Sequence, residues 1–219
     1  MPERHIQFLR VERAAAGETA ATARTRLADK FARTALRRMT HLGLLTGAVL
    51  DGVPLGPDDA VVYASTFAET RALEDYLTSF PSASPLLFQT SIHPSAMQQV
   101  LIGRQQPVRR FWPVTGRRRL VESALLCALL EPAPRAVLAG GEERGTWLLE
   151  QGMASDEAFA FGLVLTTDPA GAAGHISFQH QRGIPDEACP GLLEFAVALA
   201  ERRALRWHGA GGEWSVDWK

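Results

Sequence analysis

Cysteine is scarce in this chain of 219 residues, which carries only Cys127 and Cys189. Two cysteines so far apart in the sequence favour neither a disulfide framework nor a zinc site. Cys127 lies inside the apolar run 125–130, so we expect a buried and inert thiol there. The six histidines are scattered and form no HxxxH or HExxH pair. We therefore expect neither a metal nor a cofactor.

Long apolar runs and a large excess of one charge are also lacking. No stretch approaches the roughly 20 apolar residues that a membrane span requires, and the N-terminus, MPERHIQFLRVE, has no signal-peptide core. The formal net charge of −1 argues against a broad nucleic-acid-binding surface. We expect a soluble, cytoplasmic protein with no membrane span and no nucleic-acid partner.

Signature motifs of nucleotide binding and of serine hydrolases are missing as well, since no GxGxxG, GxxxxGKS/T or GxSxG occurs. Carboxylate pairs occur at 58–59, 142–143 and 156–157. Chain neighbours do not face each other in a regular element, so these pairs do not by themselves predict acid–base catalysis. Arginines gather at 37–38, 109–110, 117–119 and 202–203. Each group either meets an acidic partner or forms a solvated face.

What the sequence does contain is an alternation of strand-like and helix-like segments. Alternating or β-branched apolar residues predict strands at 5–13, 60–66, 108–114, 135–143, 157–167 and 174–180, and a closing hairpin of 204–208 with 213–218. Apolar residues at helical spacing predict helices at 19–34, 35–50, 69–80, 95–103, 117–130 and 191–204. This order indicates an α/β fold with a mixed sheet covered by helices. We expect a single domain over 1–219.

Two segments need separate comment. Prolines flank the stretch PLLFQTSIHP, 85–94, and restrict it, so we expect an extended conformation there. The expected helix 117–130 is apolar nearly all round, which is typical of a buried central helix.

The stretch 107–130, PVRRFWPVTGRRRLVESALLCALL, predicts a strand, a tight turn at Thr115 and Gly116, and then that helix. Several enzyme folds display a nucleophile at such a strand–turn–helix corner. Here the corner carries Thr, Gly and three arginines, with neither Cys nor Ser.

Several segments, taken in order, resemble the N-terminal half of the β-ketoacyl-acyl carrier protein synthases, which have the thiolase fold. These segments are AVVYASTFAETRALEDYL (60–77), SPLLFQTSIHPSAMQQVLIGRQQP (84–107), RFWPVTGRRRLVESALLCALL (110–130), RAVLAGGEERG (135–145) and EAFAFGLVLTT (157–167). More narrowly, the length and the stretch RRMTHLGLLTGAVL (37–50) are similar to β-ketoacyl synthase N-terminal-like proteins. These are chain length factors of aryl polyene and xanthomonadin-type clusters.

The resemblance implies half of a thiolase-like fold without the ketosynthase chemistry. Thr115 or Gly116 falls where an active ketosynthase presents its cysteine, and Cys127 lies about three helical turns further on. The two histidines of an active ketosynthase come from a second half-fold, for which 219 residues leave no room. The chain is therefore expected to be catalytically silent and to pair with a catalytic β-ketoacyl synthase as a heterodimer.

The resemblance also implies an interface and a tunnel floor. In the family, the strand before the corner pairs across the dimer axis, which places 108–114 at the interface, with Pro113 confining that strand to an edge. Phe111 and Trp112 are then interface anchors, or else ordinary core residues. Residues of the 95–103 helix, together with these two aromatics, would form the floor of the acyl tunnel, although helical spacing equally suits core packing; they are Met97, Gln98, Leu101 and Ile102.

The run Arg117, Arg118 and Arg119 is expected in the first turn of the 117–130 helix, where cations oppose the helix dipole. An acyl carrier protein or a phosphate would neutralise the positive charge of these three arginines, or else water solvates them. Two other functions stay open. One is an acyltransferase or hydrolase that uses Ser91, Thr115 or Cys189. The other is a scaffold that binds a carrier protein.

Overall fold

The computed structural model describes residues 2–181 and 188–219. Its centre is a mixed eight-stranded sheet in the order β3-β2-β4-β5-β1-β6-β8-β7. β2 runs parallel to β3 and β4, and the other neighbouring pairs are antiparallel. The strands are β1 (Glu3–Arg13), β2 (Ala60–Ser65), β3 (Arg110–Thr115), β4 (Arg135–Glu142), β5 (Phe159–Thr166), β6 (Gly174–His180), β7 (Leu205–Gly209) and β8 (Gly212–Trp218).

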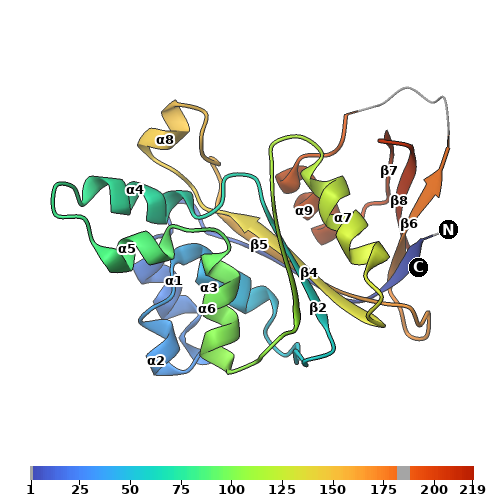
Figure 1. The fold of residues 1–219 in the computed structure, drawn as a ribbon, viewed down its shortest axis with the longest axis horizontal. Coiled ribbons are helices and arrows are strands. Elements are labelled where there is room, and N and C mark those ends of the chain that lie inside the picture. The colour runs from blue at the N-terminus through green and yellow to red at the C-terminus, as the bar shows by residue number, and fades with distance from the viewer. Residues whose placement is uncertain (1, 182–187) are drawn as a thin grey trace.

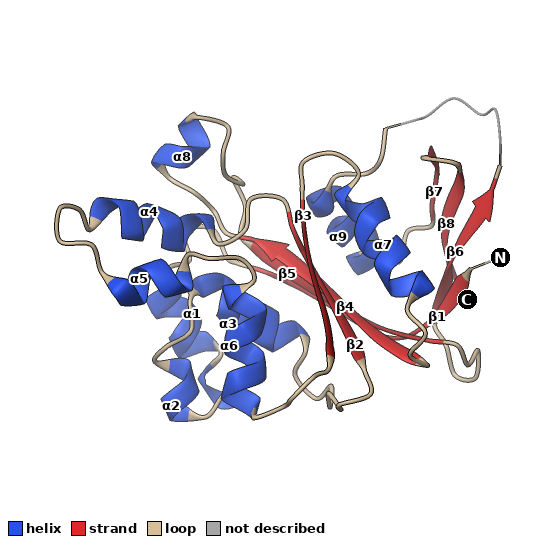
Figure 2. Cartoon of the chain, viewed as in Figure 1, coloured by secondary structure: helices blue, strands red, loops and turns tan. Residues whose placement is uncertain are grey.

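Helices cover both faces of this sheet (Figures 1 and 2). They are α1 (Ala20–Arg26), α2 (Arg33–Leu36), α3 (His41–Val49), α4 (Thr70–Thr78), α5 (Pro85–Thr90), α6 (Ser95–Arg104), α7 (Leu120–Leu130), α8 (Trp147–Glu150) and α9 (Leu192–Ala200), with a short 3-10 turn at Ala28–Lys30. α7 and α9 pack in one apolar cluster, and α1, α3 and α6 pack in another on the opposite face.

The sheet separates the two clusters because side chains alternate along each strand. On β2, Val62 and Ala64 face the α7–α9 cluster, whereas Val61 and Tyr63 face the α3–α6 cluster. A strand with apolar residues on both faces must lie between two helical layers. The predicted α/β fold with a mixed, helix-covered sheet is confirmed.

The two glycines of the AGG motif are required at the point where β4 lies between β2 and β5. A Cβ on Gly140 would lie 2.6 Å from the Ala64 carbonyl oxygen, and one on Gly141 would lie 2.3 Å from the Phe159 oxygen. Both distances are shorter than a carbon–oxygen contact permits, so the backbones can approach only without side chains. This close approach brings Glu142, at the end of β4, into the interior.

The predicted helix 117–130 begins later, at Leu120, and one side of it is buried against the sheet. Its other side exposes Leu126 at 40% and Leu130 at 62%. The shorter α3 is buried more completely, since every residue from His41 to Val49 is buried.

Two sequence predictions are wrong. The segment 85–94 is not extended throughout, because Pro85–Thr90 forms α5. The Ser84 side chain caps α5 by accepting from the Leu87 N–H, and Pro85 suits a first helical position. The predicted helices 19–34 and 35–50 are broken into shorter pieces. Thr40 accepts from the Gly43 N–H and starts α3 afresh at His41.

Candidate functional site

The corner between β3 and α7 carries its arginines in the connection, not in the helix. β3 ends at Thr115 and α7 begins at Leu120. Arg119 is the residue before the helix, and its backbone is left-handed with φ 55°. The prediction that residues 117–119 form the first helical turn is wrong. The unfavourable dipole interaction inferred from it does not apply.

Other residues of this chain already contact two of these arginines. Arg117 donates to the Gly152 carbonyl and lies 5.3 Å above the Phe67 ring centre. Arg119 lies 3.3 Å from a Glu122 carboxylate oxygen. Arg118 is exposed. The corner therefore presents arginines that are partly fixed in place at the end of the edge strand.

No candidate nucleophile of the sequence analysis has the environment of one. Thr115 is exposed, and within residues 2–181 and 188–219 no hydrogen bond joins its hydroxyl to a histidine or a carboxylate. The Ser91 hydroxyl donates to the Phe88 carbonyl at 2.8 Å. Burial raises the pKa of both Cys127 and Cys189, which disfavours a thiolate. Cys127 is half-buried, less than expected.

The strand before the corner is an edge strand, as Pro113 predicts, because β3 has β2 as its one neighbour in the sheet. Phe111 packs partly buried against the α3–α6 cluster. Trp112 points to the other face, is 49% exposed, and donates its indole N–H to Glu131 at 2.9 Å. The two aromatics therefore have different surroundings. Phe111 belongs to the core, and Trp112 lies at the surface beside the end of α7.

The four candidate tunnel-floor residues of α6 separate in the same way. Met97 is fully buried and Leu101 partly buried in the α3–α6 cluster. Gln98 is exposed, and Ile102 is 76% exposed. The structure thus brings Met97, Leu101 and Phe111 together inside the protein, and leaves Gln98 and Ile102 on the outer side of α6.

A pair of buried carboxylates lies at the end of β4, where Glu142 and Glu143 point to different segments. Glu142 accepts from the backbone N–H groups of Thr66 and Phe67. Glu143 accepts from Leu42 at 3.0 Å and Arg71 at 2.9 Å, which ties it to the N-termini of α3 and α4. Burial raises the pKa of each carboxyl to about 7, against the lowering effect of these hydrogen bonds.

Two glutamates on and before α4 have the same role. Glu69 accepts from the Ala96 N–H at 2.9 Å at the start of α6, and Glu74 accepts from the Thr146 N–H at 2.7 Å. Buried carboxylates at helix starts are stabilised by free N–H groups and by the helix dipole. These acids therefore hold helices together, which explains their burial without assigning them catalysis.

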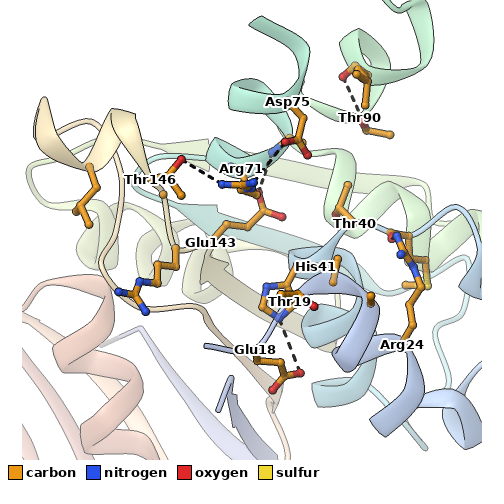
Figure 3. A pocket seen from close by; sticks show the side chains of 18 of the residues that line it. Glu18, Thr19, Arg24, Thr40, His41, Arg71, Asp75, Thr90, Glu143 and Thr146 are labelled. Carbon is orange, nitrogen blue, oxygen red and sulfur yellow. Dashed lines mark hydrogen bonds and ion pairs between the residues drawn. The ribbon is translucent and has the colours of Figure 1, made fainter. Parts of the chain in front are cut away.

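Beside this layer lies a pocket with a volume of 1210 Å³. Its walls come from α1, the 37–41 segment, α4, α5 and the 143–150 segment. Figure 3 shows His41 and Glu18 on one side and Arg71, Asp75 and Thr146 on the other. Arg71 donates to the Thr146 hydroxyl at 3.1 Å across this second wall. No motif in the sequence predicts this pocket, although the arginine doublet at 37–38 lines it.

Within the described ranges, no group of three or more His, Cys, Asp or Glu residues is placed to hold a metal ion. Nor is any helix of these ranges long and apolar enough to cross a membrane.

The layered sheet, the edge strand and the corner define a thiolase-like fold of the ketosynthase type. One chain of the ketosynthase ApeO–chain length factor ApeC complex from Xenorhabdus doucetiae aligns with a TM-score of 0.63 and 17% identity, over 98% of both chains. A chain of the ishigamide ketosynthase/chain length factor aligns with a TM-score of 0.56 and 13% identity, over 71% of this chain and 53% of that one. No family model and no curated protein matches. The predicted resemblance is confirmed in the fold.

Proposed function

We propose that this chain is a non-catalytic, chain length factor-like subunit that pairs with a catalytic β-ketoacyl synthase in polyketide or fatty-acid-like biosynthesis. The observation that carries the proposal is a ketosynthase-type corner without an activated nucleophile in the described residues. The full-length structural alignment with a chain of a ketosynthase–chain length factor complex supports it. A subunit without an activated nucleophile can still act by shaping or stabilising its partner.

The pairing surface in this proposal is the outer edge of β3 and the adjoining face of α7. Leu126 and Leu130 lie four residues apart and therefore share one face of α7. Leu130 is next to Glu131, which holds the indole of Trp112. The apolar side chains of Trp112, Leu126 and Leu130 are 49%, 40% and 62% exposed, respectively. An apolar patch beside an unpaired strand edge favours association with another chain.

The tunnel floor is assigned to the exposed part of α6. A floor is a steric device, so it requires volume rather than chemistry. Ile102 and Gln98 are the α6 candidates that project outward. Met97 and Leu101 support them from the core by fixing α6 against α3. In this assignment Ile102 limits the acyl chain directly, whereas Met97 acts through the position of the helix.

Three finer parts of the proposal rest on the family resemblance. The product is of the aryl polyene type, the pair works in the cytoplasm, and an acyl carrier protein docks near Arg118 at the corner. The exposed Arg118 supports the last part, because carrier proteins in the resembled family are acidic and opposite charge steers association.

The test of the proposal is co-expression with full-length ketosynthases encoded near this chain, followed by affinity purification and light scattering. A stable complex is expected with one of them. The Trp112→Ala variant should weaken it about tenfold or more, the scale of an interface anchor. Trp147→Ala is the matched control, since Trp147 is 43% exposed and lies on α8, outside the proposed pairing surface of β3 and α7. Failure to bind any such ketosynthase, or equal effects of both variants, would overturn the proposal.

A further inference from the structure

The pocket beside the glutamate layer is rich in arginine, and most of that charge has no carboxylate partner. Arg71 pairs with Glu74 and Asp75. For Arg24, Arg37, Arg38 and Arg144, which also line the pocket, no ion pair occurs within the part of the chain that the structure describes. Guanidinium groups converging on one concave wall create a local positive potential.

The carboxylates that line the pocket do little to neutralise these arginines. Glu18 is 3.0 Å from Arg26, which is not one of the residues that line the pocket, and Asp75 is 3.7 Å from Arg71. Glu143 is buried and already accepts from backbone N–H groups of α3 and α4. Glu150, which is exposed on α8, offsets part of the positive charge of the pocket arginines. The wall formed by α1 and residues 37–41 therefore stays cationic.

The same wall contains buried nitrogen atoms that make no hydrogen bond. His41 is 8% exposed, and among the described residues its Nε2 has no hydrogen-bond partner; it lies 3.9 Å from a Glu18 oxygen. Arg24 donates from Nη2 to the Met39 carbonyl at 3.0 Å, while its buried Nε makes no such bond. A buried polar group without a partner destabilises the protein. Because His41 and Arg24 line the pocket, a polar ligand atom bound there would supply the partner that these nitrogens lack.

The opposite walls add apolar side chains to the pocket. Leu86 and Leu87 of α5, with Trp147 and Leu149 of α8, line the pocket there. Leu86 is 65% exposed and Trp147 is 43% exposed, so both offer surface to a ligand. A cavity with a cationic wall and with exposed apolar side chains opposite it fits a molecule that has an acidic head and an apolar stem.

We propose that this pocket binds an anionic amphiphile, with a phosphate or carboxylate head held by Arg24, Arg37 and Arg38 and an apolar stem against Leu86 and Trp147. The neutral side chain of His41 contributes a hydrogen bond to the head. This inference does not depend on pairing with a ketosynthase, because the pocket draws none of its walls from β3 or α7.

The experiment is isothermal titration calorimetry of the full chain, in whatever assembly it purifies, with decyl phosphate and with decanoate below their micelle concentrations. Saturable binding of at least one probe is expected, weakening as salt is added. The two probes decide between a phosphate and a carboxylate head. Inorganic phosphate alone should bind at least tenfold more weakly, because it lacks the stem.

The Arg37→Gln/Arg38→Gln variant should weaken binding of the preferred probe tenfold or more. Both side chains are exposed, so a thermal-melting control should show a folded protein. Arg33→Gln/Arg109→Gln removes the same charge outside the pocket lining and should change binding less than twofold. Trp147→Ser should weaken decyl phosphate or decanoate binding but not that of inorganic phosphate.

The inference fails if neither amphiphile binds saturably, or if the outside double variant weakens binding as much as the pocket variant. Inorganic phosphate binding as tightly as decyl phosphate would overturn the apolar half of the site. Co-purification of Arg37→Gln/Arg38→Gln with the ketosynthase keeps this result separate from the pairing proposal, since that variant should pair normally.

Discussion

At the scale of single residues, Glu143 links segments of the fold that are far apart in the sequence. Its carboxylate lies at the end of β4 and accepts backbone N–H groups from Leu42 and Arg71, at the starts of α3 and α4. Removing a carboxylate from water is unfavourable in free energy. The hydrogen bonds and two helix dipoles offset part of this unfavourable term. Burial and the charge of nearby Glu69 leave its pKa raised to about 7.

Glu143→Gln should flatten the pH dependence of stability. Between 4.5, its ordinary value, and about 7, the folded state keeps a proton that the unfolded state releases. The stability from this proton is fully present below the unfolded pKa and is lost as the pH rises through the folded pKa. A shift of this size corresponds to roughly 3 kcal/mol. Urea unfolding at about pH 5 and about pH 8 measures the loss in parent and variant.

Glu150→Gln is the matched control, because Glu150 is exposed on α8. Glu142 and His41 titrate in parent and variant alike, so their contributions cancel in the difference. The account requires the parent to lose more stability than Glu143→Gln between the two pH values. Equal losses in both proteins would show that Glu143 is not protonated in the folded state.

At the scale of elements, α7 combines a core face with a surface face. Leu125 is fully buried among the α7–α9 cluster, while its neighbour Leu126 is 40% exposed. The helix covers the sheet on one side and lies next to the edge strand on the other (Figure 2). Substituting these two leucines one at a time therefore distinguishes an effect on folding stability from an effect on association with a partner.

Leu125→Ala should lower the free energy of unfolding by about 2–5 kcal/mol, since it leaves a cavity in the core. Leu126→Ala should cost less than about 1 kcal/mol, because a half-exposed side chain loses little packing. Leu126→Ala should instead weaken the complex with the ketosynthase. Denaturant titration and complex affinity together give the comparison. If Leu126→Ala destabilised the chain as much as Leu125→Ala, the surface assignment would be wrong.

The outer side of α6 can be tested through product length. Ile102 is 76% exposed, and truncating a residue that forms a tunnel floor leaves room for a longer chain. Ile102→Ala in the reconstituted pair should therefore shift products to greater length, as read by mass spectrometry. Ile92→Ala is the matched control, being 48% exposed and ahead of the helix. An unchanged product distribution would favour a scaffold that shapes no tunnel.

Helices and strands were predictable where the residues that determine them are neighbours in the sequence. The short β-branched run of β2 and the long apolar run of α7 gave the right element types, because burial keeps polar residues out of such segments and their lengths differ. α5 was missed because Pro85 was interpreted as a restriction rather than as a first helical residue after the Ser84 cap. The break before α3 depends on the Thr40 cap, a signal that the long apolar pattern obscured.

At the scale of the whole molecule, the fold was predictable and most of the site was not. The order of ketosynthase-like segments indicated the thiolase-like layers, and the edge position of β3 followed from Pro113. The arginine-rich pocket draws on segments near residues 18–24, 37–41, 71–75 and 143–150, which are far apart in the sequence. Their meeting depends on tertiary packing, and no spacing in the sequence encodes it. The single domain over 1–219 stays a prediction.

The central claim, that this chain assists a condensing enzyme without doing the chemistry, is tested by removing nucleophiles from one subunit at a time. In the purified pair, the variant Ser91→Ala/Thr115→Ala/Cys189→Ala of this chain should keep the condensation rate within about twofold. Replacing the ketosynthase's own cysteine should reduce that rate by orders of magnitude. A rate that collapses with the triple variant, or condensation by this chain alone, would contradict the account.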